Sequence, residues 1–292
     1  MVNLNLVRNL HEGFYGEGPS SAAADEQVVH RHEAKLELRR SQPIGGGAWI
    51  QPRLAVRLDH LMTFRAADPL ATPRPELLDE LLAREEEGSR VSFEGGIDAG
   101  LPFSQGAVQL SSTLRVKDGD LVQAVVGVVL DRTWLLGGHR TITALLTLDR
   151  TVHRSDGVPY YFLPQLDDRL APGLDRFRFY GNDRIVLGAT YVHPIFEILK
   201  SHAYEGLINF GLSQVYDDVF QDFGARIAIS PDGSTFAGSV PLKPTMGIGS
   251  RLVSRLSGAV IGSVILGFSA EGLQAGTLRI TQRLSDWYSV LR

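Results

Sequence analysis

Residues 108–130 read VQLSSTLRVKDGDLVQAVVGVVL, and the pattern within this stretch indicates the class of fold. Apolar and polar side chains alternate along its first part. The apolar set is Val108, Leu110, Leu114 and Val116, and the opposing polar set is Gln109, Ser111, Thr113, Arg115 and Lys117. A tight Asp118-Gly119 turn follows, and the alternation resumes with Val122, Ala124, Val126, Val128 and Leu130 on one face. A period of two residues is the signature of a strand, so the stretch predicts a β-hairpin.

The same alternation occurs along most of the chain. Besides the two strands of this hairpin, the expected strands are 2–7, 34–39, 50–64, 91–97, 142–149, 184–192, 202–213, 245–254, 258–269 and 276–284. This makes about 12 strands in total. Residues 73–87 break the pattern, because their leucines recur at helical spacing among acidic residues. They predict a short amphipathic helix inside a long loop.

The connections between the expected strands alternate in length. Short links are expected near 41–47, 99–106, 131–139, 193–201 and 254–258, and long ones near 8–32, 65–89, 150–183 and 214–244; the short turns near 117–120 and 270–275 are exceptions. Membrane barrels have short periplasmic turns and long external loops, whereas soluble domains rarely need several long structureless loops. The chain is therefore predicted to be all-β, an antiparallel transmembrane β-barrel with long external loops. A soluble β protein is the alternative, because alternation alone fits both.

Composition excludes several classes of function. The chain has 292 residues, of which 43% are hydrophobic, and it has no cysteine, so neither a disulfide framework nor thiol chemistry is expected. Its formal net charge of −4 gives no reason to expect nucleic-acid binding. The eight histidines show no metal-ligand spacing, and no catalytic or phosphate-binding motif is present. We therefore expect a protein that is not an enzyme, with no catalytic, cofactor-binding or metal residues.

A family resemblance is found in residues 157–191, GVPYYFLPQLDDRLAPGLDRFRFYGNDRIVLGATY. A long irregular segment there ends in an arginine–aromatic cluster at 176–180, turns at Gly181-Asn182, and enters an alternating strand. The segment resembles the long inward-folded loop of the bacterial surface-antigen family of outer-membrane β-barrels, the BamA/TamA-like proteins. The matching residues are Val158-Pro159-Tyr160-Tyr161, Leu163-Pro164, Leu166, Leu174, Phe177, Arg178-Phe179, Asp183-Arg184, Ala189-Thr190-Tyr191 and Pro194.

Shorter stretches are similar to other parts of the same family. They are residues 13–21, 96–106, 209–217, 246–251 and 277–284. The chain also departs from the family pattern, with Asp167-Asp168 in place of a Gly-Gly pair and Asp175-Arg176 in place of an Arg-Gly pair. Gly211 stands where the family has an aspartate.

The resemblance implies one barrel domain over residues 1–292, with an inward-folded loop at 150–183. Barrels of the family have 16 strands with five after the long loop, whereas this chain shows five after it and about seven before it. Our interpretation is that the first four strands, and any periplasmic domains before them, are missing from this sequence. No signal peptide begins the sequence, although an outer-membrane protein is expected to have one. A complete barrel of about 12 strands is the alternative.

The resemblance also implies a set of residues inside the barrel. In the family an arginine at the tip of the loop enters the lumen and pairs with acidic residues of the inner wall, as its planar guanidinium can hold a carboxylate through two hydrogen bonds. The candidates in the loop are Arg176, Phe177, Arg178 and Asp183, and the candidate wall partners are Asp149, Glu205 and also Asp183. Which of the two arginines is the equivalent one stays open, and a solvated position for both is the alternative.

The function implied by the resemblance is insertion and assembly of outer-membrane proteins, or export of polypeptides, at the bacterial outer membrane. The expected partners are the lipid bilayer and unfolded β-barrel client proteins. A passive pore, or a surface-structural barrel that anchors other domains without insertase activity, is the second hypothesis.

Overall fold

The structure is a computed structural model that describes residues 2–14, 27–63, 88–155, 158–166, 174, 179–198, 201–218, 242–256, 260–269 and 272–280. The amphipathic helix expected at 73–87 lies outside this part of the chain. None of the described segments is a helix long and apolar enough to cross a bilayer.

Thirteen strands and one 3₁₀ turn at Tyr160–Phe162 make up the described fold. The strands are β1 (Val2–Phe14), β2 (Gln27–Arg39), β3 (Gln42–Gly45), β4 (Ala48–Thr63), β5 (Gly88–Phe103), β6 (Gly106–Lys117), β7 (Asp120–Leu136), β8 (Arg140–Arg154), β9 (Asp183–Ile198), β10 (His202–Tyr216), β11 (Lys243–Ser254), β12 (Val260–Ser269) and β13 (Gly272–Ile280). All but β3 follow one another in a single sheet in the order of the chain, and β3 pairs with β4 alone. The predicted all-β antiparallel barrel class is confirmed.

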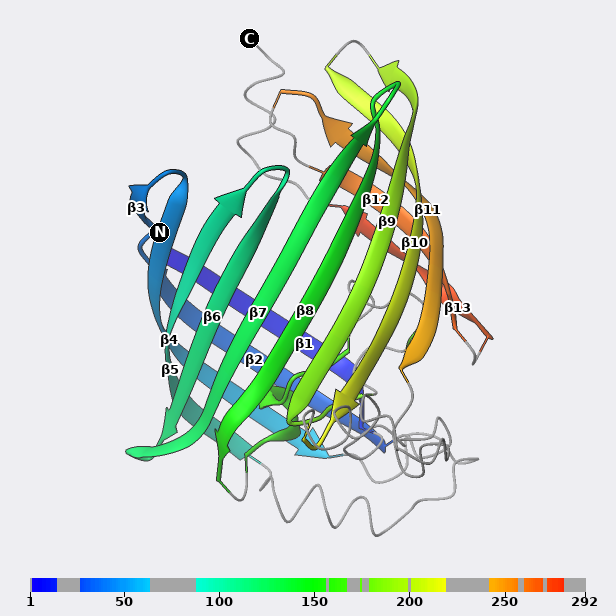
Figure 1. Ribbon diagram of the computed structural model, residues 1–292. Coiled ribbons are helices and arrows are strands. Elements are labelled where there is room, and N and C mark those ends of the chain that lie inside the picture. The colour runs from blue at the N-terminus through cyan, green and yellow to red at the C-terminus, as the bar shows by residue number, and fades with distance from the viewer. Residues whose placement is uncertain are drawn as a thin grey trace, which may run out of the picture.

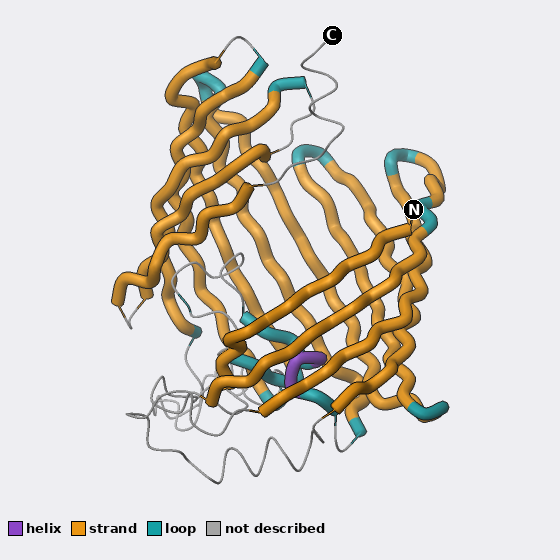
Figure 2. Tube along the Cα trace, turned by 180° about the vertical axis from the view of Figure 1, so that it is seen from behind, coloured by secondary structure: helices purple, strands orange, loops and turns teal. Residues whose placement is uncertain are grey.

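The sheet rolls around a lumen, with long strands inclined to the axis of the roll (Figure 1). Figure 2 shows the 3₁₀ turn inside this curve, close to the end at which the long loops emerge. In the part of the chain that the structure describes, β1 pairs with β2 and β13 with β12, and these two strands are the edges of the sheet. Among the described residues β1 and β13 do not pair with each other, so the described sheet is not closed.

Several strands run further than the sequence predicted. β8 continues to Arg154, so the long loop begins at residue 155 rather than 150. β5 continues to Phe103, so the turn expected at 99–106 contains two residues, Ser104 and Gln105. The reason at the end of β8 is pairing with β7, because Arg154 stays in register with Gln123 although its own neighbours no longer alternate. The tight turn at Asp118-Gly119 is confirmed, with φ of 53° and 95° at these residues.

The two faces of the sheet reverse the arrangement of a soluble protein. On the outer face, leucines such as Leu54 are 66% exposed, whereas on the inner face Asp59 and Glu94 are 2% and 3% exposed. Apolar residues outside and charged residues inside suit a sheet with lipid around it and a polar lumen within.

This assignment of faces predicts a difference between adjacent residues of β7. Val128 pairs with Leu110 and Leu148 on the outer face, and Val129 pairs with Gln109 and Thr147 on the inner face. Val128→Arg is expected to lower the free energy of unfolding by about 2–4 kcal/mol, because it places a charge in lipid near mid-membrane. Val129→Arg makes the same change at the same depth but on the lumen side, and it is expected to lower the free energy of unfolding by clearly less. Denaturant titration in vesicles, followed by heat-modifiable gel migration, measures both, and equal losses would contradict the assignment.

Candidate functional site

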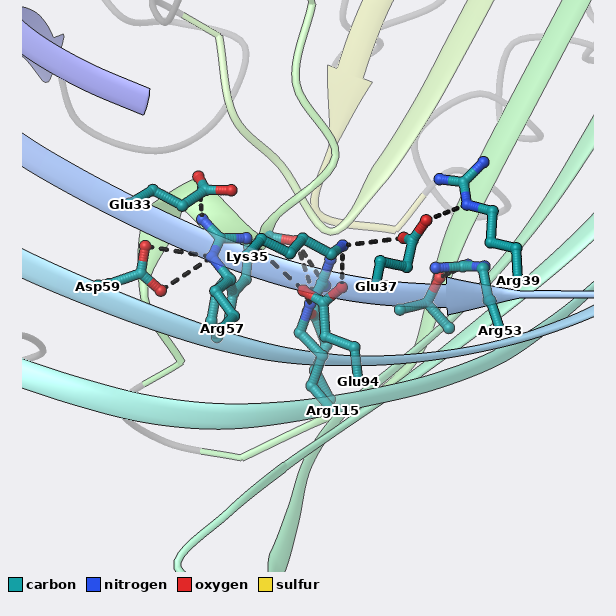
Figure 3. Close-up of polar contacts among 12 residues, drawn as sticks. Glu33, Lys35, Glu37, Arg39, Arg53, Arg57, Asp59, Glu94 and Arg115 are labelled. Atoms are coloured by element: carbon teal, nitrogen blue, oxygen red, sulfur yellow. Dashed lines mark hydrogen bonds and ion pairs between the residues drawn. The ribbon is translucent and has the colours of Figure 1, made fainter. Parts of the chain in front are cut away.

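Charged side chains line the inner face of β2, β4, β5 and β6, on strands where every second residue points into the lumen. The members of this inner-wall network are Arg31, Glu33, Lys35, Glu37, Arg39, Arg53, Arg57, Asp59, Glu94, Asp98 and Arg115, and most of them are drawn in Figure 3. Basic and acidic residues alternate along β2, whereas across β2 and β4 like charges lie opposite each other, as Lys35 does Arg57. Each member nevertheless forms an ion pair with at least one opposite charge, so the wall is nearly neutral.

Arg57 of β4 is the centre of one half of the network. Its guanidinium lies 2.8 Å from a carboxylate oxygen of Asp59 and 3.0 Å from one of Glu33, and Figure 3 shows both carboxylates directed at it. Arg31 also contacts both carboxylates, at 3.1 Å from Glu33 and 3.6 Å from Asp59. Since the side chains of Arg57 and Asp59 are 8% and 2% exposed, removal of either would leave a buried charge uncompensated.

Glu94 of β5 is the centre of the other half. Its carboxylate accepts from Lys35, lies 3.1 Å from Nε of Arg115, and is 3.6 Å from Arg57. Lys35 in turn lies 3.5 Å from Glu37, which pairs with Arg39. One buried carboxylate of β5 therefore connects its strand to three others, β2, β4 and β6.

The segment 158–166 folds inward and packs against this wall. Pro159 fixes the entry into the 3₁₀ turn Tyr160–Phe162, and the amide of Phe162 donates to the carbonyl of Pro159 at 3.0 Å. The apolar side chains of the segment form a cluster with residues of the wall. Its buried members are Leu61, Val158, Tyr160, Phe162, Leu163 and Tyr180. Because Leu61 lies near the end of β4, the cluster occupies the end of the lumen from which the long loops emerge.

Three arginines of the wall contact the aromatic rings of the turn. Arg31 lies 4.5 Å from the centroid of the Tyr161 ring, and Arg57 lies 4.7 Å from that of Phe162. Arg115 also lies 4.7 Å from the Phe162 centroid, from the β6 side. A guanidinium over an aromatic face gains most when water is excluded, as it is here. We call this set of contacts the arginine–aromatic dock.

Hydrogen bonds fix the position of the turn in the dock. The carbonyl of Phe162 accepts from Nη1 of Arg115 at 3.1 Å and from Nε2 of Gln123 at 3.3 Å. Gln123 is fully buried and also accepts from Arg115. The segment is therefore held by its backbone as well as by its rings.

The opposite wall holds the described loop residues that follow the dock. Gln165 pairs with Tyr180 in an isolated bridge, and the amide of Leu166 donates to the carbonyl of Phe179 at 3.1 Å. Leu166 and Phe179 are fully buried, in a cluster with Leu174 and two strand residues, Val186 and Val215. The loop thus spans the lumen from β4–β6 to β9–β10.

Arg184 joins the loop to this second wall. Its Nη1 donates to the carbonyl of Gln165 at 2.5 Å and its Nε donates to Asp149 at 2.8 Å. Gly127 lies beside this pair, and a Cβ there would meet Oδ1 of Asp149 at 2.5 Å. The absence of a side chain at 127 leaves room for the ion pair.

The predicted wall partners do lie on the inner face, but each has another partner. Asp149 is bonded to Arg184, and Glu205 accepts from Nε of Arg251 at 2.8 Å. Asp183 is 2% exposed and accepts from the amide of Thr151 at 3.1 Å. Arg176, Phe177 and Arg178 lie outside the described residues, so their pairing with these carboxylates stays a prediction.

The arginine–aromatic dock was not foreseen from the sequence. From the sequence, Arg57 and Arg115 were members of polar strand faces, Arg31 fell in the long link expected near 8–32, and Tyr161 was part of a motif. The usable signal was the combination of a Pro-aromatic-aromatic run with inward arginines on several strands, because such rings need a buried surface. This signal does not predict which of the arginines contact the same aromatic rings.

The arrangement offers packing and charge pairing rather than bond chemistry. Among the described residues no group of three or more histidine, cysteine, aspartate or glutamate side chains is placed to hold a metal ion. The network can fix a folded loop across the lumen, and loss of the network can release it.

Comparison with solved structures identifies the fold. The chain superposes on BamA from Haemophilus ducreyi lacking POTRA domains 1–3 with a TM-score of 0.56 and 12% identity, over 95% of this chain and 57% of that one. The chain has the fold of an outer-membrane β-barrel. An outer membrane channel from Pseudomonas putida F1 also matches, with a TM-score of 0.37 and 8% identity, over 95% of this chain and 90% of that one. No protein-family model and no curated protein matches the sequence. This barrel chain spans less than two thirds of the BamA chain.

The dock predicts that two arginines control access to the loop. The chain has no cysteine, so an introduced thiol is the sole reactive one. Leu163→Cys, at a site that is 4% exposed, is expected to resist maleimide labelling. Adding Arg57→Ala and Arg115→Ala is expected to speed labelling roughly tenfold or more, since each desolvated contact with an aromatic ring is worth about 1–2 kcal/mol.

Two controls accompany this experiment. Ile44→Cys, at a site that is 67% exposed, should label rapidly in every background. Arg251→Ala removes a wall arginine that pairs with Glu205 and should leave Leu163→Cys protected. Rapid labelling of Leu163→Cys with all arginines present would mean that the loop is not docked.

Proposed function

We propose that this chain is the barrel region of an outer-membrane protein that inserts β-barrel proteins into, or exports polypeptides across, the outer membrane. The observation that carries the proposal is the arginine–aromatic dock, in which the barrel's own loop fills part of the lumen. A lumen that is partly filled by the barrel's own loop suits a barrel that handles polypeptide clients under control better than it suits a passive pore. The resemblance of residues 157–191 to the surface-antigen family supports the same role.

An edge strand supports a mechanism. Among the described residues the outer edge of β13 has no paired strand, and an edge of this kind is a template for an incoming strand. A client strand that pairs there is guided into the bilayer without bond chemistry. The docked loop braces the wall from β2 to β6, because Arg31, Arg57 and Arg115 of three different strands contact its rings.

The loop arginines have a place in this proposal. We propose that Arg176 or Arg178 adds a further charge contact on the β8–β10 wall, where Asp149, Asp183 and Glu205 lie. Because Asp149 and Glu205 are each bonded to an arginine already, a loop arginine would share a carboxylate rather than satisfy a free one. A second anchor of this kind would hold the loop at both walls.

A passive pore or structural anchor is the second candidate, and conductance separates the two. In planar bilayers the full chain is expected to show a small conductance, because the loop obstructs the lumen. Arg57→Ala combined with Arg115→Ala is expected to raise the open probability roughly tenfold or more, from the loss of the same contacts. Arg251→Ala is the matched control and should leave the conductance and the open probability unchanged. A large steady conductance that neither variant alters would favour the pore.

Client folding tests the first candidate directly. Vesicles that contain this chain are expected to accelerate the folding of an added unfolded outer-membrane barrel, scored by heat-modifiable migration of the client. Vesicles with an equal amount of an unrelated barrel are the control. Equal folding rates in the two vesicle preparations would reject the insertase role.

A further inference from the structure

An apolar groove of about 640 Å³ crosses the outer face of β7 to β11. Its floor is made by small residues, since Ala144 of β8 lies directly opposite Ala189 of β9. Larger side chains at neighbouring positions form its walls. They are Leu130, Leu146, Leu187, Leu212, Phe210 and Trp134. A hollow of this size and polarity is typical of a small-molecule site.

The groove opens toward lipid rather than toward the lumen. Phe210 and Leu212 are 56% and 43% exposed and alternate along β10 with residues of the inner face. On that inner face Asn209 donates to Thr190 at 3.1 Å. Because successive side chains of a strand point to opposite faces, the groove belongs to the surface that faces the bilayer.

One charged residue, Arg132 of β7, lies at an end of this lining. Its guanidinium carbon is 5.4 Å from the centroid of the Trp134 ring. No carboxylate of the described residues lies within ion-pair distance of it. A cation on the lipid face is destabilising unless it reaches the interface or meets an anion.

The depth of Arg132 matches that of a lipid headgroup. The residue is followed after two positions by Trp134, and β7 ends at Leu136, before a short turn. Aromatic residues of this kind mark the membrane interface, and short turns lie on the periplasmic side. Arg132 pairs with Ala144, Ala144 with Ala189, and Ala189 with Phe210, which lies well inside β10. The groove therefore leads from the interface toward the hydrocarbon.

We propose that this groove binds one anionic phospholipid of the periplasmic leaflet, with an acyl chain over Ala144 and Ala189 and the phosphate on Arg132. An apolar channel that ends in a cation with no ion-pair partner in the described part of the chain has the complementary chemistry of such a molecule. The proposal rests on the membrane location proposed above and is independent of the insertase role. Heat-modifiable migration of each variant checks barrel formation separately.

Trp134 supplies the measurement. The chain has three tryptophans, so Trp49→Phe and Trp287→Phe leave Trp134 as the sole reporter. In neutral detergent micelles, phosphatidylglycerol with brominated acyl chains is expected to quench it saturably. Brominated diacylglycerol has the chains without the phosphate. It should reach half-saturation of quenching at a roughly tenfold higher concentration, as expected for loss of one charge-assisted contact. Glycerophosphate, which has the phosphate without the chains, should not displace the lipid at comparable concentration.

Variants assign the two halves of the site. With Arg132→Gln, brominated phosphatidylglycerol is expected to need the same concentration for half-saturation of quenching as brominated diacylglycerol. Ala144→Leu and, separately, Ala189→Leu should fill the floor and weaken quenching by both lipids. Arg140→Gln is the matched control, because this arginine lies at the turn and donates to the carbonyl of Gly137 at 2.7 Å. It should leave both titrations unchanged.

Two outcomes would overturn the proposal. Unsaturable quenching that is equal for the two brominated lipids would mean that Trp134 meets only bulk lipid. A preference for phosphatidylglycerol that survives Arg132→Gln would mean that the phosphate binds elsewhere.

Discussion

Arg57 carries a buried positive charge in the lumen wall, and the packing of the loop depends on how this charge is satisfied. Its carboxylate partners, Glu33 and Asp59, neutralise it but leave the flat face of the guanidinium without contact. Phe162 covers that face at 4.7 Å, and Arg115 covers the same ring from β6. Since desolvated charges need both pairing and contact, the wall and the loop each stabilise a conformation that the other could not hold alone.

The dock also explains how a barrel with a polar interior can have a well-packed lumen. Inward carboxylates and arginines would ordinarily face water. Here the segment 158–166 brings tyrosine, phenylalanine and leucine side chains to them, and the residues of the loop become the core that the rolled sheet lacks. The outer face is left to lipid, and one departure from its apolar character is Arg132 at the end of the groove. The chain therefore has two apolar environments, one made by its own loop and one completed by the membrane.

Much of the fold could be predicted from alternation alone, because each strand has one lipid-facing and one lumen-facing side. The hairpin at 108–130 and its Asp118-Gly119 turn are clear examples. Strand ends were less predictable, as at Arg154, since pairing with a neighbour extends a strand beyond its own pattern. The pairing of a loop arginine with Asp149 or Glu205 stays a prediction, and in the structure these two carboxylates pair with Arg184 and Arg251. Convergence of Arg31, Arg57 and Arg115 depends on the register between strands, which no single stretch of sequence carries.

A double-mutant cycle between Arg57 and Phe162 tests the central claim most directly. Unfolding free energies in vesicles are measured for the full chain, Arg57→Met, Phe162→Leu and the double variant. If the ring and the guanidinium are in desolvated contact, the coupling energy should be about 1–2 kcal/mol. A coupling energy indistinguishable from zero, with both single variants folded, would contradict the account, because the loop would then not be held by the wall.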